Sequence, residues 1–587
     1  MIFMKVLKNK IIPLIETVLQ DYDLEIEKYE DLIQDPRDRN VCDLCIPCFS
    51  LAKILKENPI KIAENISKKI NELSGEDIEV KSLNGYVNFS SNPKWLANKL
   101  FLENYEFFED VNKKNILIEH TSANPNGPFH VGRARNAILG DCLVRLNREI
   151  GNEVIAEYYV DDMGKQVGIL SWAIENIPID EVESILKNNQ IDDLNPMWKN
   201  KEDHIRVRWY QAANILRKDN LKIEEELTEI INKSEEGDEE VLTKFNNAFQ
   251  PILDGMLETL SKLGINYDSF TNESKFIIDG SVNKIMKDLE KSELFGEAEN
   301  GAKYLELSEK GVSGKSTKFF FRRGDGSSLY ATRDLAYHQW KWGKAEKLIN
   351  VLGEDHRLQS KQVSVALNEL NIKAPEVVFY AFIKLPEGKM STRKGNVVFM
   401  DDLIFEAEEI ALKLLSERNI KIEEKEKLKI AKAVASSAIR FNILKVSPEK
   451  GFTFKWEDAL SFDSDSAPFI MYSHARSCSI NKKVKNLGLK EETLELSEIE
   501  INNSISKLLR TIFRYEEAIE KSILENKPNH FCYYMLELST AYNLFYRDCP
   551  IIVDSKINVF NYKVSEYSRK LLFRGCNALG IIPLESM

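Results

Sequence analysis

The pattern of hydrophobic and polar positions divides the chain into segments of different kinds. In residues 1–105, helical periodicity over 11–22 and 49–73 is followed by two short β-favouring runs, 78–83 and 86–90. The Asn-Gly pair between these runs is typical of a tight hairpin turn. This first segment is therefore predicted to be a small α+β domain.

From residue 106 onward, the order of the elements is that of a parallel sheet. An apolar strand pattern at 115–120 precedes a loop rich in proline, asparagine and glycine, a helical pattern at 131–150 and a second strand pattern at 153–160. The same order of strand, helix and strand returns between 347 and 385. Units of this kind form parallel sheets, in which the loops that follow the strands meet at the carboxyl edge.

The two units predict an α/β fold with a Rossmann-like, doubly wound parallel sheet over residues 106–400. The charged helical segment at 177–315 is expected to be an inserted domain, and its acidic stretch, 234–240, to be a solvated loop. After the sheet, helical patterns dominate. We expect a connecting helical region over 401–465 and an all-α bundle over 466–587.

Composition and charge are those of an ordinary globular protein. Of the 587 residues, 43% are hydrophobic and 29% are charged, and apolar runs such as 377–383 are far too short for a membrane span. The first residues show no signal-peptide pattern, so a cytoplasmic protein is expected. The net charge of −13 conceals a segment, 466–587, with 16 basic and 14 acidic residues, a balance compatible with RNA binding.

Three of the eight cysteines form a C-x2-C-x2-C run, Cys42, Cys45 and Cys48, which could suggest a metal site. No fourth cysteine or histidine lies nearby in the sequence, and the run leads directly into a helical apolar pattern. Free cysteine is most often a small buried hydrophobic residue. We therefore predict packing and no bound metal.

The first candidate for chemistry is the loop EHTSANPNGPFHVGR at 119–133, between a strand and the helix after it. A helix N-terminus offers unpaired N–H groups and the positive end of the helix dipole, which suit a phosphate. Gly132 permits close approach of a nucleotide, and His130 can donate to a phosphoryl oxygen as charge builds. Taken alone, this short match is weak.

The second candidate is KMSTRKG at 389–395, just after the last strand. Its cations, Lys389, Arg393 and Lys394, can neutralise a triphosphate and the pyrophosphate that leaves it. An isolated stretch of this kind is more often a solvated basic loop. However, the two candidates lie about 260 residues apart, each after a strand in one half of the doubly wound pattern. Together they favour an ATP site at one edge of the sheet.

This pair resembles the HIGH and KMSKS signatures of the class I aminoacyl-tRNA synthetases. The surrounding sequence resembles one family in that class, the arginyl-tRNA synthetases of the archaeal type, over essentially the whole chain. The stretches that carry the resemblance are NGYVNF (84–89), IEHTSANPNGPFHVGRARNAILGD (118–141), YYVDDMGKQ (158–166), DGSSLYATRDLAYH (325–338), LGEDHRLQ (352–359), KMSTRKGNVV (389–398), YSHARSCSI (472–480), FYRDCPII (545–552) and LGIIPLESM (579–587).

Recognition of a guanidinium requires carboxylates that can accept from its planar fork of N–H donors. Glu119 and Asp334 are the natural candidates, with Tyr330 one helical turn before Asp334. The resemblance adds further residues around the substrates. It implies arginine binding by Glu119, Ser122, Asn124, Tyr330, Asp334 and His356; ATP binding by Pro128, His130, Gly132, Arg133, Asn136, Met390 and Ser391; and catalysis by His130, Arg133, Lys389, Ser391, Arg393 and Lys394.

Two positions depart from the family signatures. The second histidine of the first signature is Arg133, a permanent cation, and the second lysine of the other signature is Thr392. Some relatives that lack this lysine carry one just before the first signature, where this chain has Gly127. We expect Arg133 or Lys394 to compensate.

The resemblance implies an arginine–tRNA ligase that uses ATP with Mg²⁺ and no tightly bound cofactor. L-Arginine would be activated to arginyl-adenylate and transferred to the 2′-hydroxyl of the terminal adenosine of tRNA(Arg), with activation dependent on bound tRNA. The first domain would contact the outer corner of the tRNA and the C-terminal bundle its anticodon. A monomer without membrane attachment is expected. The alternatives are a non-catalytic tRNA-binding paralogue and a superfamily nucleotidyltransferase that acts on a small molecule.

Overall fold

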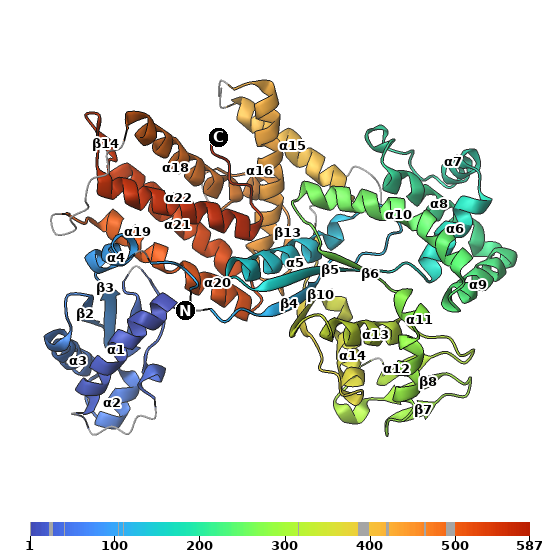
Figure 1. Cartoon of the computed structure of the whole chain (residues 1–587), viewed down its shortest axis with the longest axis horizontal. Helices are drawn as coiled ribbons and strands as arrows, with labels where there is room; N and C mark the ends of the chain where they lie inside the picture. The colour runs from blue at the N-terminus through green and yellow to red at the C-terminus, as the bar shows by residue number, and fades with distance from the viewer. Residues whose placement is uncertain are drawn as a thin grey trace. The chain divides into compact units, whose positions relative to one another are not determined.

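The computed structural model divides the chain into two compact units (Figure 1). The central unit comprises Lys113–Leu460 and Ala578–Ile581, and the terminal unit comprises Met1–Asn112, Ser461–Asn577 and Ile582–Met587. The structure describes residues 2–20, 22, 28–39, 41–103, 105–109, 111–314, 316–384, 398–417, 422–462, 465–488 and 499–587.

The core of the central unit is a five-stranded parallel sheet, so the predicted fold class is confirmed. In spatial order its strands are β11 (Glu376–Tyr380), β10 (Lys347–Gly353), β4 (Asn115–Glu119), β5 (Glu153–Val160) and β6 (Ser269–Asn272). Strands β4 and β10 are short apolar runs whose middle residues are buried, as expected for strands covered on both faces.

The order of the strands creates a crevice in the middle of the sheet. The chain enters at β4, runs through β5 and β6 on one side, and then crosses to β10 and β11 on the other side. The loops after β4 and β10 therefore leave the carboxyl edge in opposite directions. In open α/β sheets, ligands bind at such a switch point.

One buried helix, α5 (Val131–Glu149), begins within the first signature and packs against the sheet. Its Gly140 lies against the side chain of His120, just after β4, because a Cβ at Gly140 would come within 2.2 Å of that side chain. The other side of α5 packs against α16 (Glu424–Leu444), which pairs with α15 (Met400–Glu417). The expected long helical stretch after the sheet is thus two helices that lie side by side.

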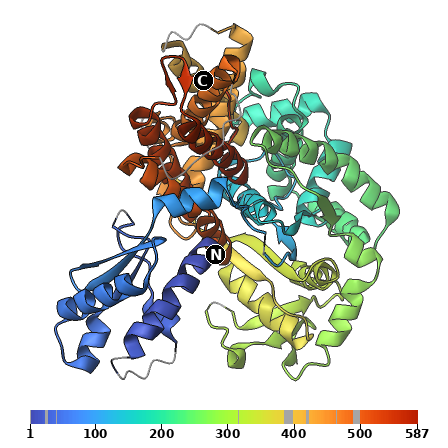
Figure 2. The ribbon, with the colours of Figure 1, turned by 60° about the vertical axis from the view of Figure 1, so that its left-hand side comes forward.

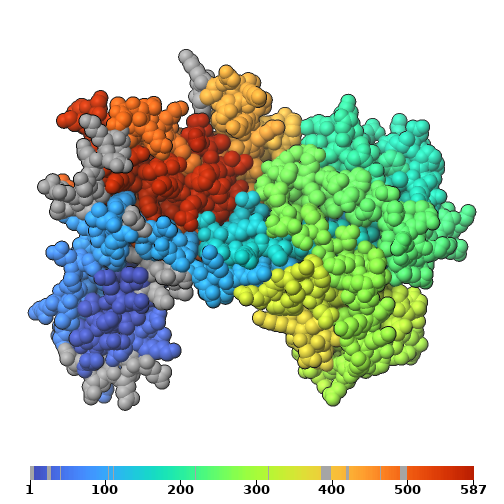
Figure 3. Space-filling model, in the orientation of Figure 1, coloured from blue at the N-terminus to red at the C-terminus, as the bar shows by residue number. Residues whose placement is uncertain are grey.

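Between β5 and β6 lies a group of helices, and between β6 and β10 lies a small antiparallel sheet with helices beside it; Figure 3 shows them as two lobes. Strand β6 falls inside the range expected for the insert, yet it pairs with β5 in the main sheet. The elements of the first group are α6 (Lys165–Asn176), α7 (Ile179–Asn188), α8 (Glu202–Leu216), α9 (Leu221–Glu235) and α10 (Glu239–Lys262). Those of the second are α11 (Lys275–Ile278), α12 (Ser281–Leu289), β7 (Phe295–Glu297), β8 (Lys303–Glu306), β9 (Lys318–Arg322) and α13 (Tyr330–Trp342), and α14 (Arg357–Glu369) connects β10 to β11.

The acidic stretch 234–240 is not a solvated loop, and that expectation was wrong. Helix α9 continues to Glu235 and α10 begins at Glu239, with a short turn between them. The side chain of Glu235 is only 7% exposed and forms ion pairs with Arg323 and Arg333. Partners almost a hundred positions away neutralise it, which the local sequence does not reveal.

In the terminal unit, helices α1 (Ile2–Gln20) and α3 (Pro59–Leu73) pack beside a three-stranded antiparallel sheet (Figure 2). The predicted hairpin is confirmed, since Asn84 and Gly85 both have positive φ between two paired strands. The sheet has the order β1 (Leu44–Pro47), β3 (Tyr86–Ser91), β2 (Ile78–Leu83).

The remaining part of the terminal unit is mainly helical, with one short antiparallel pair of strands, β14 (Ile552–Val553) and β15 (Lys556–Ile557). Its main helices are α4 (Pro93–Phe101), α18 (Ala467–Leu487), α19 (Asn503–Phe513), α20 (Tyr515–Leu524), α21 (Asn529–Asp548) and α22 (Val559–Leu579). The three clustered cysteines are buried at β1, and the Cys42 thiol donates to the Asn88 side chain at 3.2 Å. Over the described residues, no helix combines the length and the apolar character that crossing a membrane would require.

Candidate active site

A cavity of about 710 Å³ opens at the carboxyl edge of the central sheet, around the switch point between β4 and β10. It brings together residues that are far apart in the sequence. The predicted residues that line it are Glu119, Ser122, Asn124, His130, Gly132, Arg133, Asn136, Tyr330, Asp334 and His356.

The other predicted residues lie elsewhere. Pro128 is buried in the loop and does not line the cavity, because the side chain packs into the protein while the neighbouring His130 reaches the surface of the cavity. The second signature lies outside the described residues, so the structure does not describe its predicted residues Lys389, Met390, Ser391, Arg393 and Lys394.

The loop after β4 has a strained backbone that several hydrogen bonds hold in place. Thr121 and Ser122 have φ values of 70° and 39°, a region that β-branched residues in particular avoid. The Asn136 amide accepts from Thr121 N at 2.6 Å and donates to Val351 O at 2.9 Å, so it links this loop to β10. Strain of this kind persists where the surroundings over-determine the conformation, which is common at functional sites.

Glu119 lies at the end of β4, where a buried lysine neutralises it. Lys341 Nζ contacts Glu119 Oε2 at 2.7 Å and Asn350 Oδ1 at 3.0 Å, and the lysine side chain is fully buried. Ser122 Oγ donates to the other carboxylate oxygen at 3.2 Å. The carboxylate is thus held in a fixed orientation at the wall of the cavity.

Helix α13 presents a row of polar side chains to the same cavity. Tyr330 begins the helix, and Asp334 and His338 follow one and two turns later. His338 Nδ1 lies 3.2 Å from Asp334 Oδ1. Burial opposes ionisation of Asp334, but His338 and Lys341 together hold the pKa of this carboxyl below its ordinary value. Asp334 is therefore a carboxylate at neutral pH.

The N-terminus of α5 forms another part of the cavity wall. His130 is the N-cap residue, and burial followed by the nearby Arg133 cation lowers the pKa of His130 to about 4. Its imidazole is therefore neutral at pH 7 and can donate one hydrogen bond. A Cβ at Gly132 would come within 3.0 Å of this ring, so glycine leaves the space that the imidazole occupies.

Two further predicted residues lie at the cavity beside Asp161, which sequence reasoning missed. The Asn124 amide donates to Gln166 Oε1 at 2.9 Å, and His356 is exposed at the start of α14. Asp161 also lines the cavity, and burial raises its pKa to about 6 although Arg333 opposes the shift. Its position directly after β5 was a usable signal, because that strand also ends at the carboxyl edge.

Lys341, His338 and Asn350 were also missed by sequence reasoning. His338 and Lys341 lie one and two turns beyond Asp334 on one face of α13, so helical spacing could have identified them. The contact between Lys341 and Glu119 joins positions 222 residues apart, and only the fold brings these two residues together.

Three family models match successive parts of the chain. Residues 96–456 match the family model for "tRNA synthetases class I (R), catalytic domain", residues 470–587 match the DALR anticodon binding domain, and residues 7–90 match the arginyl tRNA synthetase N terminal domain. An arginine–tRNA ligase of Methanocella arvoryzae is 40% identical over 92% of both chains. One of Methanocaldococcus jannaschii is 35% identical over 96% of both chains.

Solved structures show the same fold. The arginyl-tRNA synthetase of Thermus thermophilus aligns with a TM-score of 0.77 at 23% identity, over 98% of this chain and 99% of that one. The Plasmodium falciparum arginyl-tRNA synthetase aligns with a TM-score of 0.74 at 17% identity, over 99% of both chains. Together with the family match of residues 96–456, these structures show that the parallel sheet is the catalytic domain of a class I aminoacyl-tRNA synthetase. Within this class, the chain belongs to the arginyl-tRNA synthetase family.

Proposed function

We propose that the protein is an arginine–tRNA ligase and that the cavity between β4 and β10 is where L-arginine is activated with ATP. The arginine carboxylate attacks the α-phosphorus of ATP, the bond to pyrophosphate breaks, and arginyl-adenylate forms. The 2′-hydroxyl of the terminal adenosine of tRNA(Arg) then attacks the arginyl carbonyl carbon, and AMP leaves. The protein contributes mainly by positioning the reactants and stabilising charge.

The observation that carries the proposal is the presence of opposite charges inside one cavity. Carboxylates from β4 and α13, Glu119 and Asp334, and the N-terminus of α5 with His130 and Arg133 all line this cavity. The carboxylates suit a guanidinium, and the helix N-terminus suits phosphates. A cationic amino acid and a nucleotide triphosphate can therefore be bound in a defined orientation.

On the ATP side, His130 donates to a phosphoryl oxygen from its neutral imidazole, and Arg133 supplies a permanent positive charge. ATP enters with Mg²⁺ as its counterion. Position 127 has no room for the lysine that some relatives carry there, because a Cβ in place of Gly127 would come within 2.6 Å of the Val207 side chain on α8. Arg133 and the cations of the second signature, Lys389, Arg393 and Lys394, remain to stabilise the pyrophosphate, with Ser391 and Met390 beside ATP.

The domains outside the cavity are proposed to bind tRNA(Arg). Residues 1–105 would contact its outer corner, residues 401–465 its stem and residues 466–587 its anticodon. The family resemblance also leads us to propose a monomeric cytoplasmic enzyme that activates arginine only when tRNA is bound.

The test is ATP–pyrophosphate exchange with each of the twenty amino acids, with and without tRNA from the same organism. Exchange with arginine alone, and only with tRNA, is expected. Exchange with a different amino acid would refute the substrate, and exchange without tRNA would refute the coupling. In the same assay, Arg133→Ala is expected to lower the rate at least about tenfold, equivalent to about 1.4 kcal/mol of transition-state stabilisation.

The two alternatives predict different results. A non-catalytic paralogue would bind tRNA without consuming ATP, whereas a nucleotidyltransferase for a small molecule would not need the DALR domain that residues 470–587 match. The ordered carboxylates, the neutral His130 and the intact anion site at α5 favour the ligase over both.

A further inference from the structure

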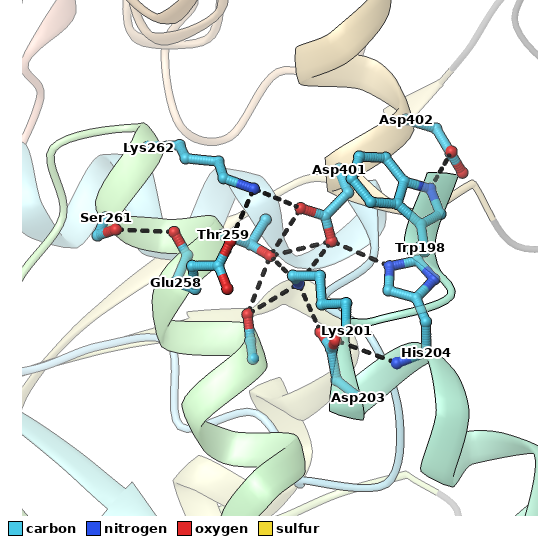
Figure 4. Close-up of polar contacts among 11 residues, drawn as sticks. Trp198, Lys201, Asp203, His204, Glu258, Thr259, Ser261, Lys262, Asp401 and Asp402 are labelled. Carbon is cyan, nitrogen blue, oxygen red and sulfur yellow. Dashed lines mark hydrogen bonds and ion pairs between the residues drawn. The ribbon is translucent and has the colours of Figure 1, made fainter. Parts of the chain in front are cut away.

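Behind the ATP side of the cavity, a buried cluster of charged side chains joins α8, α10 and the start of α15 (Figure 4). Its centre is Asp401, whose side chain is fully buried. The carboxylate accepts from Lys201 Nζ at 2.8 Å, His204 Nε2 at 3.0 Å and Thr259 Oγ1 at 3.0 Å, and Lys262 Nζ lies 3.4 Å away.

The cluster is internally neutralised and leaves no place for a metal ion. Asp203, His204 and Asp401 offer oxygen and nitrogen atoms within 4.8 Å of one another, as cation ligands would. However, the ammonium group of Lys201 already lies among them, 2.7 Å from Asp203 Oδ2 and 2.8 Å from Asp401 Oδ2. Burial opposes ionisation of Asp401, yet His204 and Lys201 hold the pKa of this carboxyl well below its ordinary value.

The segment just before Asp401 is paired with the first signature. Met400 N donates to Phe129 O at 2.7 Å, and Val131 N donates to Val398 O at 3.0 Å. His130 and Phe399 thus face each other across an antiparallel β-bridge. The backbone on both sides of His130 is fixed by a segment whose next residue is Asp401.

The aromatic side chains around the cluster strengthen this link. The ring of His204 stacks on Trp198 at 5.3 Å and meets Phe399 edge-on at 5.2 Å. Phe399 is therefore held from two directions, by its own backbone bridge to His130 and by the ring of His204. Gly127 of the signature loop also packs closely against Val207 of α8.

We propose that Asp401 is a positioning residue for the ATP site: the cluster holds residues 398–400 against α8 and α10, and these residues fix the backbone of His130. The inference rests on the proposed role of His130 in ATP binding. In this arrangement the helices between β5 and β6 support the phosphate-binding loop from behind. Apolar residues would stabilise a core equally well, whereas a buried, hydrogen-bonded charge cluster specifies one geometry.

The neighbouring residue Asp402 provides a matched control. It is one position further along α15, is only half-buried, and accepts a single described hydrogen bond, from Trp198 Nε1 at 2.8 Å. Asp401→Asn and Asp402→Asn make the same chemical change, but only the first removes the charge that Lys201 and His204 share.

The test compares the two variants by ATP–pyrophosphate exchange in the full chain with tRNA bound. For Asp401→Asn, kcat/KM for ATP is expected to fall between about 10- and 100-fold, the order that a displacement of about 1 Å produces. KM for arginine should stay within about twofold, and Asp402→Asn should behave as the wild type, because the asparagine amide oxygen can still accept from Trp198 Nε1. Unchanged ATP kinetics in folded Asp401→Asn, or an equal loss for arginine, would overturn the inference.

Two more variants keep the test decisive. If Asp401→Asn does not fold, Thr259→Val removes the hydroxyl that donates to Asp401 and accepts from Lys201, with little change of shape, and a loss confined to ATP kinetics is still expected. His130→Ala in the same assay separates the two proposals. Normal exchange by His130→Ala would refute the role of His130 itself, whereas a loss there with normal ATP kinetics in Asp401→Asn and Thr259→Val would refute only the role of the cluster.

Discussion

At the scale of single residues, the site depends on charges that are placed in pairs. Glu119 and Lys341 form the most buried of these pairs at the cavity, and Asn350 and His338 surround the lysine. A buried ion pair contributes little to stability when complete, but loss of one partner leaves an uncompensated charge and costs about 3–5 kcal/mol. The orientation of the Glu119 carboxylate at the cavity therefore depends on Lys341, which does not itself line the cavity.

Lys341→Met should therefore weaken arginine binding. The variant leaves Glu119 buried without its cation and free to change orientation, so KM for arginine is expected to rise at least about tenfold, while KM for ATP changes little. Steady-state exchange at varied arginine and varied ATP measures both constants. Lys344→Met, which removes a lysine one turn later on the protein surface, is the control. An equal effect of the two substitutions would contradict the role given to the pair.

The neutral state of His130 has a consequence for pH dependence. Because burial and Arg133 lower its pKa to about 4, the imidazole has already lost its proton at pH 5.5 and stays neutral up to pH 8.5. His130→Ala removes one transition-state donor and is expected to lower kcat about 100-fold. The ratio of wild-type to variant rates, measured by exchange across this range, should be constant. A ratio that changes with a midpoint near the ordinary histidine pKa of about 6.5 would show that the cation is the active form.

At the scale of helices and strands, local patterns predicted the elements that form the sheet. The apolar runs of β4, β5 and β10 and the helix α5 were predicted within a residue or two, because buried strands and long helices have strong periodic patterns. Strand β6 was not predicted. It has four residues and a largely polar sequence, and only its pairing with β5 makes it a strand.

In the candidate site, too, residues in local motifs were predicted, and residues placed by tertiary packing were not. Glu119, His130 and Asp334 belong to sequence motifs and were predicted to lie together, as the cavity shows. The residues that hold them, Lys341 and Asp401, were not predicted. Their partners are 222 and 200 positions away, and such pairs are set by tertiary packing rather than by any local period.

The packing of α5 on β4 gives a prediction at this scale. Alanine favours helices over glycine by about 1 kcal/mol, so Gly140→Ala would stabilise a free helix. Here the new Cβ would come within 2.2 Å of His120, which is buried and bonded to Thr121 through Nδ1 at 3.0 Å. We expect Gly140→Ala to have a lower thermal unfolding temperature and slower ATP–pyrophosphate exchange, because overpacking costs about 1–3 kcal/mol.

Gly75→Ala is the control for Gly140→Ala, because nothing lies within 4 Å of a Cβ at that position. Its unfolding temperature should match that of the wild type. If Gly140→Ala proves as stable as the wild type, α5 can shift away from β4 without penalty, and the first signature is not fixed by this contact.

At the scale of the whole molecule, the chain returns to the central unit at its C-terminal end. Ala578–Ile581 belong to that unit, although the residues on both sides belong to the terminal unit. Arg440 of α16, which is fully buried, donates to Leu579 O at 3.2 Å and to Leu263 O at 3.0 Å. Its guanidinium also contacts Asp141 of α5 at 2.5 Å. Leu579 is thereby connected, through Arg440, to the helix that begins with the first signature.

Gly580→Ala should show that this connection matters for activity. Gly580 has a φ of 68°, and a Cβ there would come within 2.2 Å of the Arg440 guanidinium, which Leu579, Leu263 and Asp141 hold in place. Gly488 has a similar φ of 73° with nothing within 4 Å, so Gly488→Ala introduces only the backbone strain of about 1–2 kcal/mol. Thermal unfolding and arginine-dependent ATP–pyrophosphate exchange are measured on both variants. The comparison distinguishes the backbone strain of alanine at positive φ from the clash of the new Cβ with Arg440. Gly580→Ala is expected to lose more stability and to exchange more slowly, because displacement of Arg440 leaves Asp141 on α5 without that partner. Equal behaviour of the two variants would mean that the C-terminal return contributes no support to the active site.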